Sequence, residues 1–493
     1  MIYNFNLGIG WASSGVEYAQ IYRARMFRNI GIDAKFVFTD MFPSENMEHM
    51  TKNIGFLDSE VIWLYTFFTD FKTAPVTYSL SDLEKTFTDL NYTKTREGKI
   101  CRYVFGGSNN FYTAYMVNDH DDFVHRVELV SNGFLIRKDY FTYGRVYSEY
   151  YAPLDNKAHL YHRRFFNENG SVAYEEIIDD DRVMYKFKDK ILCSKEEFVG
   201  YMVSKLNLTS DDVVLIDRST DIGQSILMNC KPARVGTVVH ADHFSEKDTN
   251  DDYILWNNFY EYEFNMHKHI DFYICSTQAQ SDLMVQQFEK YYGVTPCVYT
   301  IPVGSLPELK YPSSTRKPYS LITASRLASE KHVDWICKAV IQARSEVPEL
   351  SLDIYGEGGE KSKLETIIRE NNASSYIHLM GQHDLSEVYQ NYEAYIAGST
   401  SEGFGLTLME AVGGGLPIIG FDVRYGNPTF IRDGENGYLI DLPEEDKDKI
   451  EALRKGIVDL FKQDLEKCHS VSYSVAKDFL TSNVQEKWRE AVC

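Results

Sequence analysis

Two acidic residues lie eight positions apart in the segment 401–410, on either side of a glycine-flanked phenylalanine. Residues 394–398 predict a short buried strand, and residues 406–412 predict a helix. Glycines in the turn between them let backbone N–H groups approach a ligand at the helix start. With Glu402 at the turn and Glu410 on the helix, the segment predicts a nucleotide-sugar site. The alternative is a helix start with an acid near its positive end, which needs no ligand.

Two cations follow a strand predicted over 320–325: Arg326, and Lys331 five residues later. Open α/β sheets bind ligands beyond the carboxyl ends of their strands. Positive charges there could hold both phosphates of a diphosphate and neutralise charge on a leaving group, a role otherwise given to a metal. Glycine-bearing turns at 356–360 and 381–383 follow further predicted strands and suit nucleotide contacts. The alternative for the two cations is a solvated surface.

Composition limits the class of protein. The chain has 493 residues, 44% hydrophobic and 25% charged, which is typical of a soluble protein of two or three domains. A net charge of −21 without a long basic run argues against a nucleic-acid partner. Neither a basic start followed by a long apolar stretch nor an apolar run of membrane-spanning length occurs. The eight cysteines form no C-x-x-C pair, which is typical of reduced cytosolic thiols.

The hydrophobic pattern divides the chain into three kinds of region. A strand at 2–7, a helix at 16–29 and a strand at 34–38 predict a βαβ opening, whose glycine-rich loop at 8–15 is weak evidence for a ligand by itself. Alternating segments rich in tyrosine and phenylalanine over 72–189 predict an antiparallel meander. Its aromatic residues serve either packing or a polypeptide-binding surface, and the pattern leaves both open.

Parallel-type strands return at 213–217 and 235–240, and a turn-rich stretch at 302–314 predicts a hinge. Strands alternating with helices beyond it predict a second doubly wound sheet. The predicted fold class is therefore α/β, with two doubly wound Rossmann-like domains and an antiparallel β-rich insertion in the first. The predicted boundaries are 1–71 and 191–314 for the N-terminal domain, 72–190 for the insertion, 315–469 for the C-terminal domain and 470–493 for a terminal helix.

These motifs resemble a known family. The cation pair, the glycine turns, the Glu402-x7-Glu410 element and the segment 426–439 occur in the order seen in retaining GT-B glycosyltransferases of family 4. Tyr425 departs from that pattern, because many members carry glycine there. The segments 6–20 and 238–245, together with the insertion, resemble the catalytic subunits of bacterial O-GlcNAc transferases for serine-rich-repeat adhesins, the GtfA family.

The resemblance implies a glycosyltransferase that transfers N-acetylglucosamine from UDP-GlcNAc to Ser and Thr hydroxyls of an adhesin, with retention of configuration. It also implies a homologous GtfB-like partner subunit, no metal cofactor and export of the adhesin by the accessory Sec pathway. The implied location is the cytoplasm, with peripheral association at the inner face of the membrane through the complex left open. The acidic run at 179–181 is expected to be a hairpin turn and not a metal site.

Residue roles also come from the resemblance. Arg326 and Lys331 would hold the diphosphate, and Glu410 would accept hydrogen bonds from the ribose hydroxyls. Glu402 and His240 would face the donor sugar. The alternative for His240 is a hydrogen-bonded core histidine. His243 is a weaker candidate. The remaining donor contacts would come from backbone and turn residues: Ser14, Gly15, Val16, Gly356, Gln382, His383, Gly403, Phe404, Gly405, Leu406 and Thr407.

Three other functions fit parts of the pattern. A non-catalytic, acceptor-binding partner on the same scaffold need not keep the cation pair and both glutamates, all of which are present here. A GT-B enzyme acting on a small-molecule or lipid-linked acceptor would not need the aromatic insertion. A sugar-nucleotide epimerase on a similar scaffold would have little use for it either. The terminal helix, by resemblance, crosses back to the first domain and ties the two halves.

Overall fold

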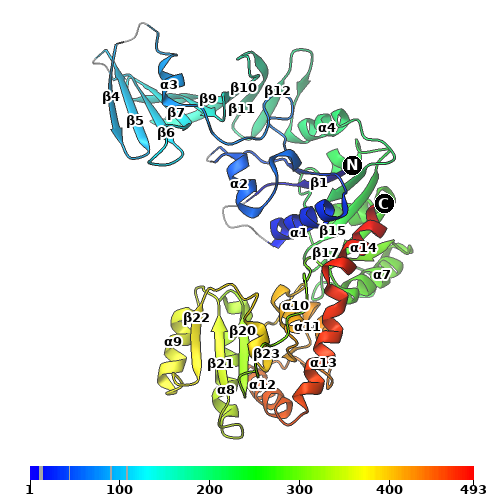
Figure 1. Ribbon diagram of the computed structural model, residues 1–493. Coiled ribbons are helices and arrows are strands. Elements are labelled where there is room, and N and C mark those ends of the chain that lie inside the picture. The colour runs from blue at the N-terminus through cyan, green and yellow to red at the C-terminus, as the bar shows by residue number, and fades with distance from the viewer. Residues whose placement is uncertain (10–14, 44, 89–90, 107–108) are drawn as a thin grey trace. The chain divides into compact units, whose positions relative to one another are not determined.

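The computed structural model describes residues 1–9, 15–43, 45–88, 91–106 and 109–493 of the chain (Figure 1). The chain forms two compact units. The first contains Met1–Ala24, Gly31–Thr237 and Asn257–Asp271, and the second contains Arg25–Ile30, Val238–Trp256 and Phe272–Cys493. No helix within the described ranges is both long enough and apolar enough to cross a membrane.

The first unit is built on parallel strands in the order β15-β14-β1-β2-β3. These strands are β1 (Ile2–Asn6), β2 (Ala34–Phe38), β3 (Val61–Trp63), β14 (Val213–Ile216) and β15 (Arg234–Val239). Every residue of β14 is buried, as expected for a parallel strand covered on both faces. The predicted βαβ opening is confirmed, because α1 (Gly15–Ile30) connects β1 to β2.

The insertion is a ten-stranded sheet whose strands follow one another in chain order, and all described neighbours pair antiparallel. The predicted meander is therefore confirmed. Its strands are β4 (Tyr92–Glu97), β5 (Ile100–Phe105), β6 (Phe111–Met116), β7 (Val124–Ser131), β8 (Phe134–Phe141), β9 (Arg145–Leu154), β10 (Lys157–Phe166), β11 (Val172–Asp179), β12 (Arg182–Lys186) and β13 (Ile191–Leu192).

Tight turns with left-handed residues join these strands. Asn132 and Gly133 have φ of 50° and 85°, the conformation that a two-residue hairpin requires. Asp180 (φ 52°) lies between β11 and β12, so the acidic run is a hairpin turn as expected. No cluster of three or more His, Cys, Asp and Glu side chains suited to a metal ion is found in the part of the chain that the structure describes.

One face of the sheet is held by stacked aromatic rings on neighbouring strands. Tyr140 stacks on Tyr147 at 4.3 Å between ring centroids, Tyr147 on Phe165 at 5.4 Å, and Phe165 on Tyr174 at 4.5 Å. All four rings are buried in the same hydrophobic cluster as Phe5 of the parallel sheet. Packing therefore accounts for the aromatic residues on this face, because cross-strand aromatic pairs stabilise a sheet.

The second unit contains a six-stranded parallel sheet in the order β22-β21-β20-β23-β24-β25. This is the doubly wound order 3-2-1-4-5-6, and the strand order reverses between β20 and β23. The strands are β20 (Ser320–Ala324), β21 (Ser351–Tyr355), β22 (Ile377–Gly381), β23 (Ala394–Ile396), β24 (Ile418–Phe421) and β25 (Gly437–Ile440). The predicted second sheet is confirmed.

Helices and four further strands complete the two units (Figure 1). In the first unit they are α2 (Met47–Ile54), α3 (Leu80–Glu84), α4 (Lys195–Lys205), α5 (Gly223–Leu227) and α6 (Glu261–Asn265). In the second they are β16 (Phe244–Ser245), β17 (Leu255–Trp256), β18 (Phe272–Cys275), β19 (Val298–Thr300), α7 (Gln278–Tyr292), α8 (Val333–Ala343), α9 (Lys361–Glu370), α10 (Leu406–Gly413), α11 (Gly426–Phe430), α12 (Asp446–Leu460), α13 (Leu465–Ala476) and α14 (Thr481–Val492). Trp488 of α14 packs edge-on against Phe27 of α1, with ring centroids 5.3 Å apart.

Candidate functional site

The candidate site lies where the strand order of the C-terminal sheet reverses. Lys331 ends a short 3-10 helix (Ser329–Lys331) that follows β20, and Glu402 lies in the loop after β23. The Lys331 Nζ donates a hydrogen bond to Glu402 Oε2 at 2.6 Å, and the two side chains are 21% and 20% exposed. The strand order reverses between β20 and β23, and doubly wound sheets bind their ligands at such a position. The structure thus brings two predicted site residues into direct contact.

Arg326 is more exposed than its predicted partner. Its side chain is 74% exposed and donates to Glu330 Oε1 at 2.8 Å, within the same turn. The loop that carries it packs tightly against the turn after β21. Gly356 there has φ of 132°, and a Cβ on it would lie 1.9 Å from the backbone oxygen of Ser325. Only glycine allows the two loops to approach this closely.

Helix α10 begins directly after the glycine turn, as the sequence predicts. Gly405 caps the helix with φ of 87°, a conformation that favours glycine. The first N–H groups of any helix have no partner within that helix, so those of Leu406 and Thr407 point toward the turn. The Thr407 hydroxyl accepts from the Tyr395 OH at 3.1 Å, which ties the start of α10 to β23.

Glu410 lies further along α10 and is half-buried. The Tyr389 OH donates to its Oε2 at 3.0 Å. Burial raises the pKa of Glu410, and the Tyr389 hydrogen bond opposes that rise. A carboxyl group in this environment can accept from further hydroxyl groups, as the predicted ribose contact requires.

His240 lies beside the glycine turn. It directly follows β15, and a Cβ built on Gly403 would lie 3.8 Å from its backbone oxygen. The two predicted sugar-side segments, 238–245 and 401–410, are therefore neighbours within the second unit. Phe404 is buried and packs edge-on against Phe430 at 5.3 Å between centroids, so this residue anchors the turn.

Tyr425 connects these two segments. Its backbone N–H donates to Glu402 O at 2.5 Å, and its OH donates to Asp242 Oδ1 at 2.5 Å. The same hydroxyl lies 3.4 Å from His243 Nδ1, and His243 Nε2 lies 2.7 Å from Gln287 Oε1 on α7. His243 is fully buried, and burial lowers its pKa to about 4. This histidine is therefore buried and neutral near pH 7.

The predicted uracil turn follows β22. Gln382 and His383 are exposed. The His383 ring contacts the Tyr355 ring edge-on, with centroids 6.0 Å apart, and the His383 Nε2 lies 2.8 Å from Met380 O.

Gly15 and Val16 begin α1 in the first unit, where Gly15 is exposed and Val16 buried. Ser14 lies outside the described residues.

Sequence reasoning missed the side chains that position the predicted ones. Tyr389 and Tyr395 hold Glu410 and Thr407, and Asp242 receives the Tyr425 hydroxyl. Tyrosine and aspartate at these places follow no local spacing rule, because their partners lie 12 to 183 positions away in the chain. The one available signal was Tyr425 itself, a large residue where the family pattern has glycine.

Two family models match the chain. Residues 310–478 match the model described as glycosyl transferases group 1, and residues 93–189 match the GtfA extended beta-sheet domain. A doubly wound sheet with a charged site at its switch point, together with a second Rossmann-like sheet, defines a glycosyltransferase of the GT-B class.

Full-length relatives narrow the class further. The chain is 52% identical over 492 residues to the UDP-N-acetylglucosamine–peptide N-acetylglucosaminyltransferase GtfA subunit of Streptococcus agalactiae, covering 99% of this chain and 97% of the relative. The crystal structure of a GtfA/B complex contains a chain with TM-score 0.96 and 52% identity, covering 100% of this chain and 99% of that one. The pneumococcal O-GlcNAc transferase GtfA in complex with UDP and GlcNAc has TM-score 0.85 and 49% identity, with coverage of 100% and 98%. The chain belongs to the GtfA subunit family.

Proposed function

We propose that this chain transfers N-acetylglucosamine from UDP-GlcNAc to Ser and Thr hydroxyls of a serine-rich-repeat adhesin. The observation that carries the proposal is the Lys331–Glu402 contact at the switch point of a GT-B sheet. This contact places a cation that can stabilise the departing diphosphate beside a carboxylate that can orient the sugar. Membership of the GtfA family supports the choice of donor and of a polypeptide acceptor.

In this proposal the positive charge stabilises the leaving group. Lys331 and Arg326 hold the diphosphate and stabilise the charge that develops as the bond to the anomeric carbon breaks, assisted by N–H groups at the start of α10. Glu410 accepts from the ribose hydroxyls, and Gly356, Gln382 and His383 contact the nucleotide. The turn 403–407 completes the donor site. Ser14, Gly15 and Val16 close over the phosphates from the other Rossmann-like domain.

The sugar lies on the other side of the same turn. Glu402 and His240 orient it, and the acceptor hydroxyl attacks from the face that the diphosphate leaves, with a phosphate oxygen taking its proton. The new bond then keeps the configuration of the donor. NMR of the product checks this step: an α-linkage is expected from the α-linked donor, and a β-linkage would overturn it. No metal is expected, so activity should persist in the presence of EDTA.

The same family supports a proposal for the partner and the location. A homologous GtfB-like subunit binds this chain and helps to present the acceptor. The complex lies in the cytoplasm, with peripheral contact to the membrane. The insertion 72–190 binds the acceptor. The terminal segment 470–493, predicted as one helix, is divided between the end of α13 and α14; in this proposal it ties the two Rossmann-like domains, which would let donor binding order the site. Export of the adhesin then follows glycosylation, through the accessory Sec pathway.

One incubation separates the alternatives. The purified chain, with and without the partner, is mixed with UDP-GlcNAc and a Ser/Thr-rich peptide, and the products are analysed by mass spectrometry. Transfer to the peptide supports the proposal. A chain that neither transfers nor hydrolyses the donor is the non-catalytic subunit, and epimerised sugar without transfer overturns the assignment to transferases.

A further inference from the structure

His332 has a backbone conformation that residues other than glycine seldom adopt. It directly follows Lys331 and lies between the 3-10 helix Ser329–Lys331 and α8. Its φ of 43° and ψ of 42° are left-handed, so its Cβ lies close to the following carbonyl oxygen. A residue stays in such a strained conformation only where its surroundings hold it there, and such residues cluster at functional sites. The strain here lies next to the predicted diphosphate cation.

The ring of His332 stacks on Trp335 in the first turn of α8. The two ring centroids are 3.5 Å apart, and the planes are 7° from parallel. Trp335 is itself fixed, because it is buried, packs edge-on against Phe421 of β24 at 6.3 Å and lies 4.8 Å from the Lys449 Nζ. Burial lowers the pKa of His332, so the ring is neutral near pH 7 and stacks as an uncharged aromatic group. This contact offsets the cost of the left-handed backbone.

The turn at 331–332 lies directly against the loop that carries Glu402. Gly398 follows β23 in that loop, and a Cβ built on it would lie 2.8 Å from His332 O and 3.0 Å from Lys331 O. A glycine at this position therefore lets the two loops approach each other. The approach follows from the sheet, because β20 and β23 are hydrogen-bonded neighbours (Figure 1). Across this contact the Lys331 Nζ reaches Glu402 Oε2 at 2.6 Å.

We propose that His332 is a positioning residue for Lys331. Its left-handed backbone turns the chain between the 3-10 helix and α8, and the stack on Trp335 holds that turn. The Lys331 side chain therefore stays directed at Glu402 and at the donor diphosphate. The His332 ring touches no reacting group. The proposal rests on the proposed function for the diphosphate, whereas the Lys331–Glu402 contact is measurable without a donor.

The first test measures the Lys331–Glu402 contact without a donor. A double-mutant cycle of Lys331→Met and Glu402→Gln, followed by urea denaturation, gives the coupling free energy between the two side chains. The cycle is then repeated in His332→Ala, which lacks the ring and disfavours a left-handed backbone. At least half of the coupling should be lost in that background. A residue that only stabilises the fold would lower the stability of all four chains equally, so an unchanged coupling rejects the proposal.

Tyr319 provides a matched control at the other end of β20. It also has a left-handed backbone, with φ of 51°, and its ring packs against Phe461 with centroids 5.6 Å apart. It precedes β20, whereas the Lys331 turn follows that strand. Tyr319→Ala thus removes a packed ring from a left-handed residue far from the site. It should lower stability and leave both the Lys331–Glu402 coupling and kcat unchanged. Losses equal to those of His332→Ala would show a general effect and reject the proposal.

The second test measures transfer by the full-length chain with its partner subunit, UDP-GlcNAc and a Ser/Thr-rich peptide. His332→Ala should lose about 10- to 100-fold in kcat, because a misplacement of about 1 Å can cost about 100-fold, and should keep the peptide KM. In Lys331→Met the same substitution should lower kcat by less than threefold, since no charge is left to position; a full further loss rejects the proposal. His332→Phe restores a stacked ring and should recover at least a third of wild-type kcat. A loss equal to that of His332→Ala would assign the effect to the imidazole and reject the stack.

The outcomes also separate this proposal from the proposed function. If wild type transfers sugar and kcat of His332→Ala stays within threefold, the positioning role is rejected and the function stands. If wild type transfers no sugar, the function is rejected, and the coupling measured by unfolding decides the positioning role by itself. If His332→Ala does not fold, His332→Gly replaces it in both tests with the same expected losses, because glycine accepts the left-handed backbone and lacks only the ring.

Discussion

Replacing Lys331 by methionine removes the cation at the switch point and keeps most of the volume of the side chain. The lysine Nζ lies 2.6 Å from Glu402 Oε2, and about four-fifths of both side chains is buried. Two unit charges about 3 Å apart attract by roughly 5 kcal/mol at an effective dielectric constant of 20. Desolvation offsets much of this attraction, so a charged hydrogen bond of this kind contributes about 1.5–3 kcal/mol to stability.

The effect on transfer should be larger than the effect on folding. A preorganised charge that stabilises a leaving group is worth about 10²–10³ in kcat, or about 3–4 kcal/mol. We therefore expect Lys331→Met to remain folded, because native domains are stable by about 5–15 kcal/mol, and to lose at least 100-fold in kcat. Release of UDP in a coupled assay measures kcat, and urea denaturation measures the free energy of unfolding.

The matched control is Lys338→Met on α8, whose lysine pairs with Asp334 at 3.6 Å and is 42% exposed. It should keep wild-type kcat, because exposed pairs contribute little and this one faces no donor phosphate. A double-mutant cycle with Glu402→Gln measures the coupling between the two site residues. If Lys331→Met folds and keeps more than a tenth of wild-type kcat, the assignment of Lys331 to the diphosphate is refuted.

Further predictions concern the network around the turn. Tyr425→Phe removes the hydroxyl that donates to Asp242, and we expect urea denaturation to show a loss of about 1.5–3 kcal/mol; an unchanged stability contradicts the contact. The pKa of His243 is lowered to about 4 from an ordinary value near 6.5, so its contribution is complete above pH 6.5 and is lost as the pH falls toward 4. Between pH 6.5 and 5 this amounts to about 2 kcal/mol, and His243→Gln should flatten the pH dependence of unfolding by that amount. Gly356→Ala forces a Cβ to within 1.9 Å of a backbone oxygen and should lower the melting temperature, whereas Gly359→Ala, with open space, should not.

Local patterns account for what could be predicted. Continuous apolar runs such as β14 and tyrosine-rich runs such as β9 are properties of short segments, so they predicted the parallel sheets and the meander. The same holds for the glycine turn before α10 and for the hairpin at Asp180, whose backbone conformations depend on residue type. The order of motifs along the chain then placed the candidate residues at strand ends.

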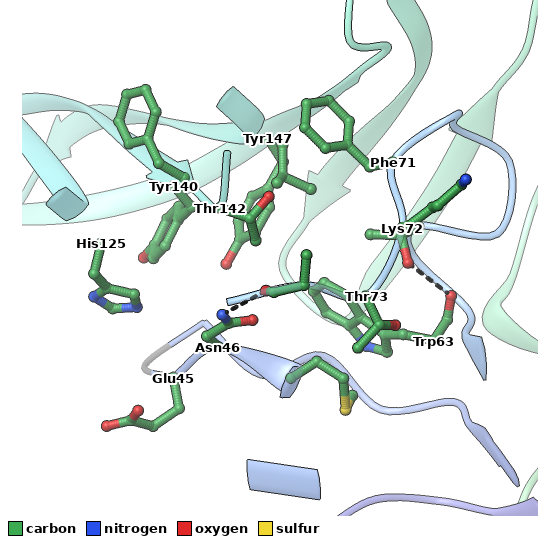
Figure 2. Close-up of a pocket in the computed structure, with 15 residues that line it drawn as sticks. Glu45, Asn46, Trp63, Phe71, Lys72, Thr73, His125, Tyr140, Thr142 and Tyr147 are labelled. Atoms are coloured by element: carbon green, nitrogen blue, oxygen red, sulfur yellow. Dashed lines mark hydrogen bonds between the residues drawn. The ribbon is translucent and has the colours of Figure 1, made fainter. Parts of the chain in front are cut away.

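Strand order in the folded sheet decided the rest. Lys331 meets Glu402 across 71 positions because β20 and β23 are neighbours, and no spacing in the chain predicts that adjacency. The Tyr425–Asp242 contact spans 183 positions and joins a loop after β24 to one after β15. The cavity lined by Trp63 and Tyr147 likewise takes its walls from the parallel sheet and the inserted sheet, which distant segments of the chain form (Figure 2). The sequence by itself determined the elements and the chemical groups at their ends. Only the tertiary structure decided which groups pair, because side-chain contacts depend on how the elements pack.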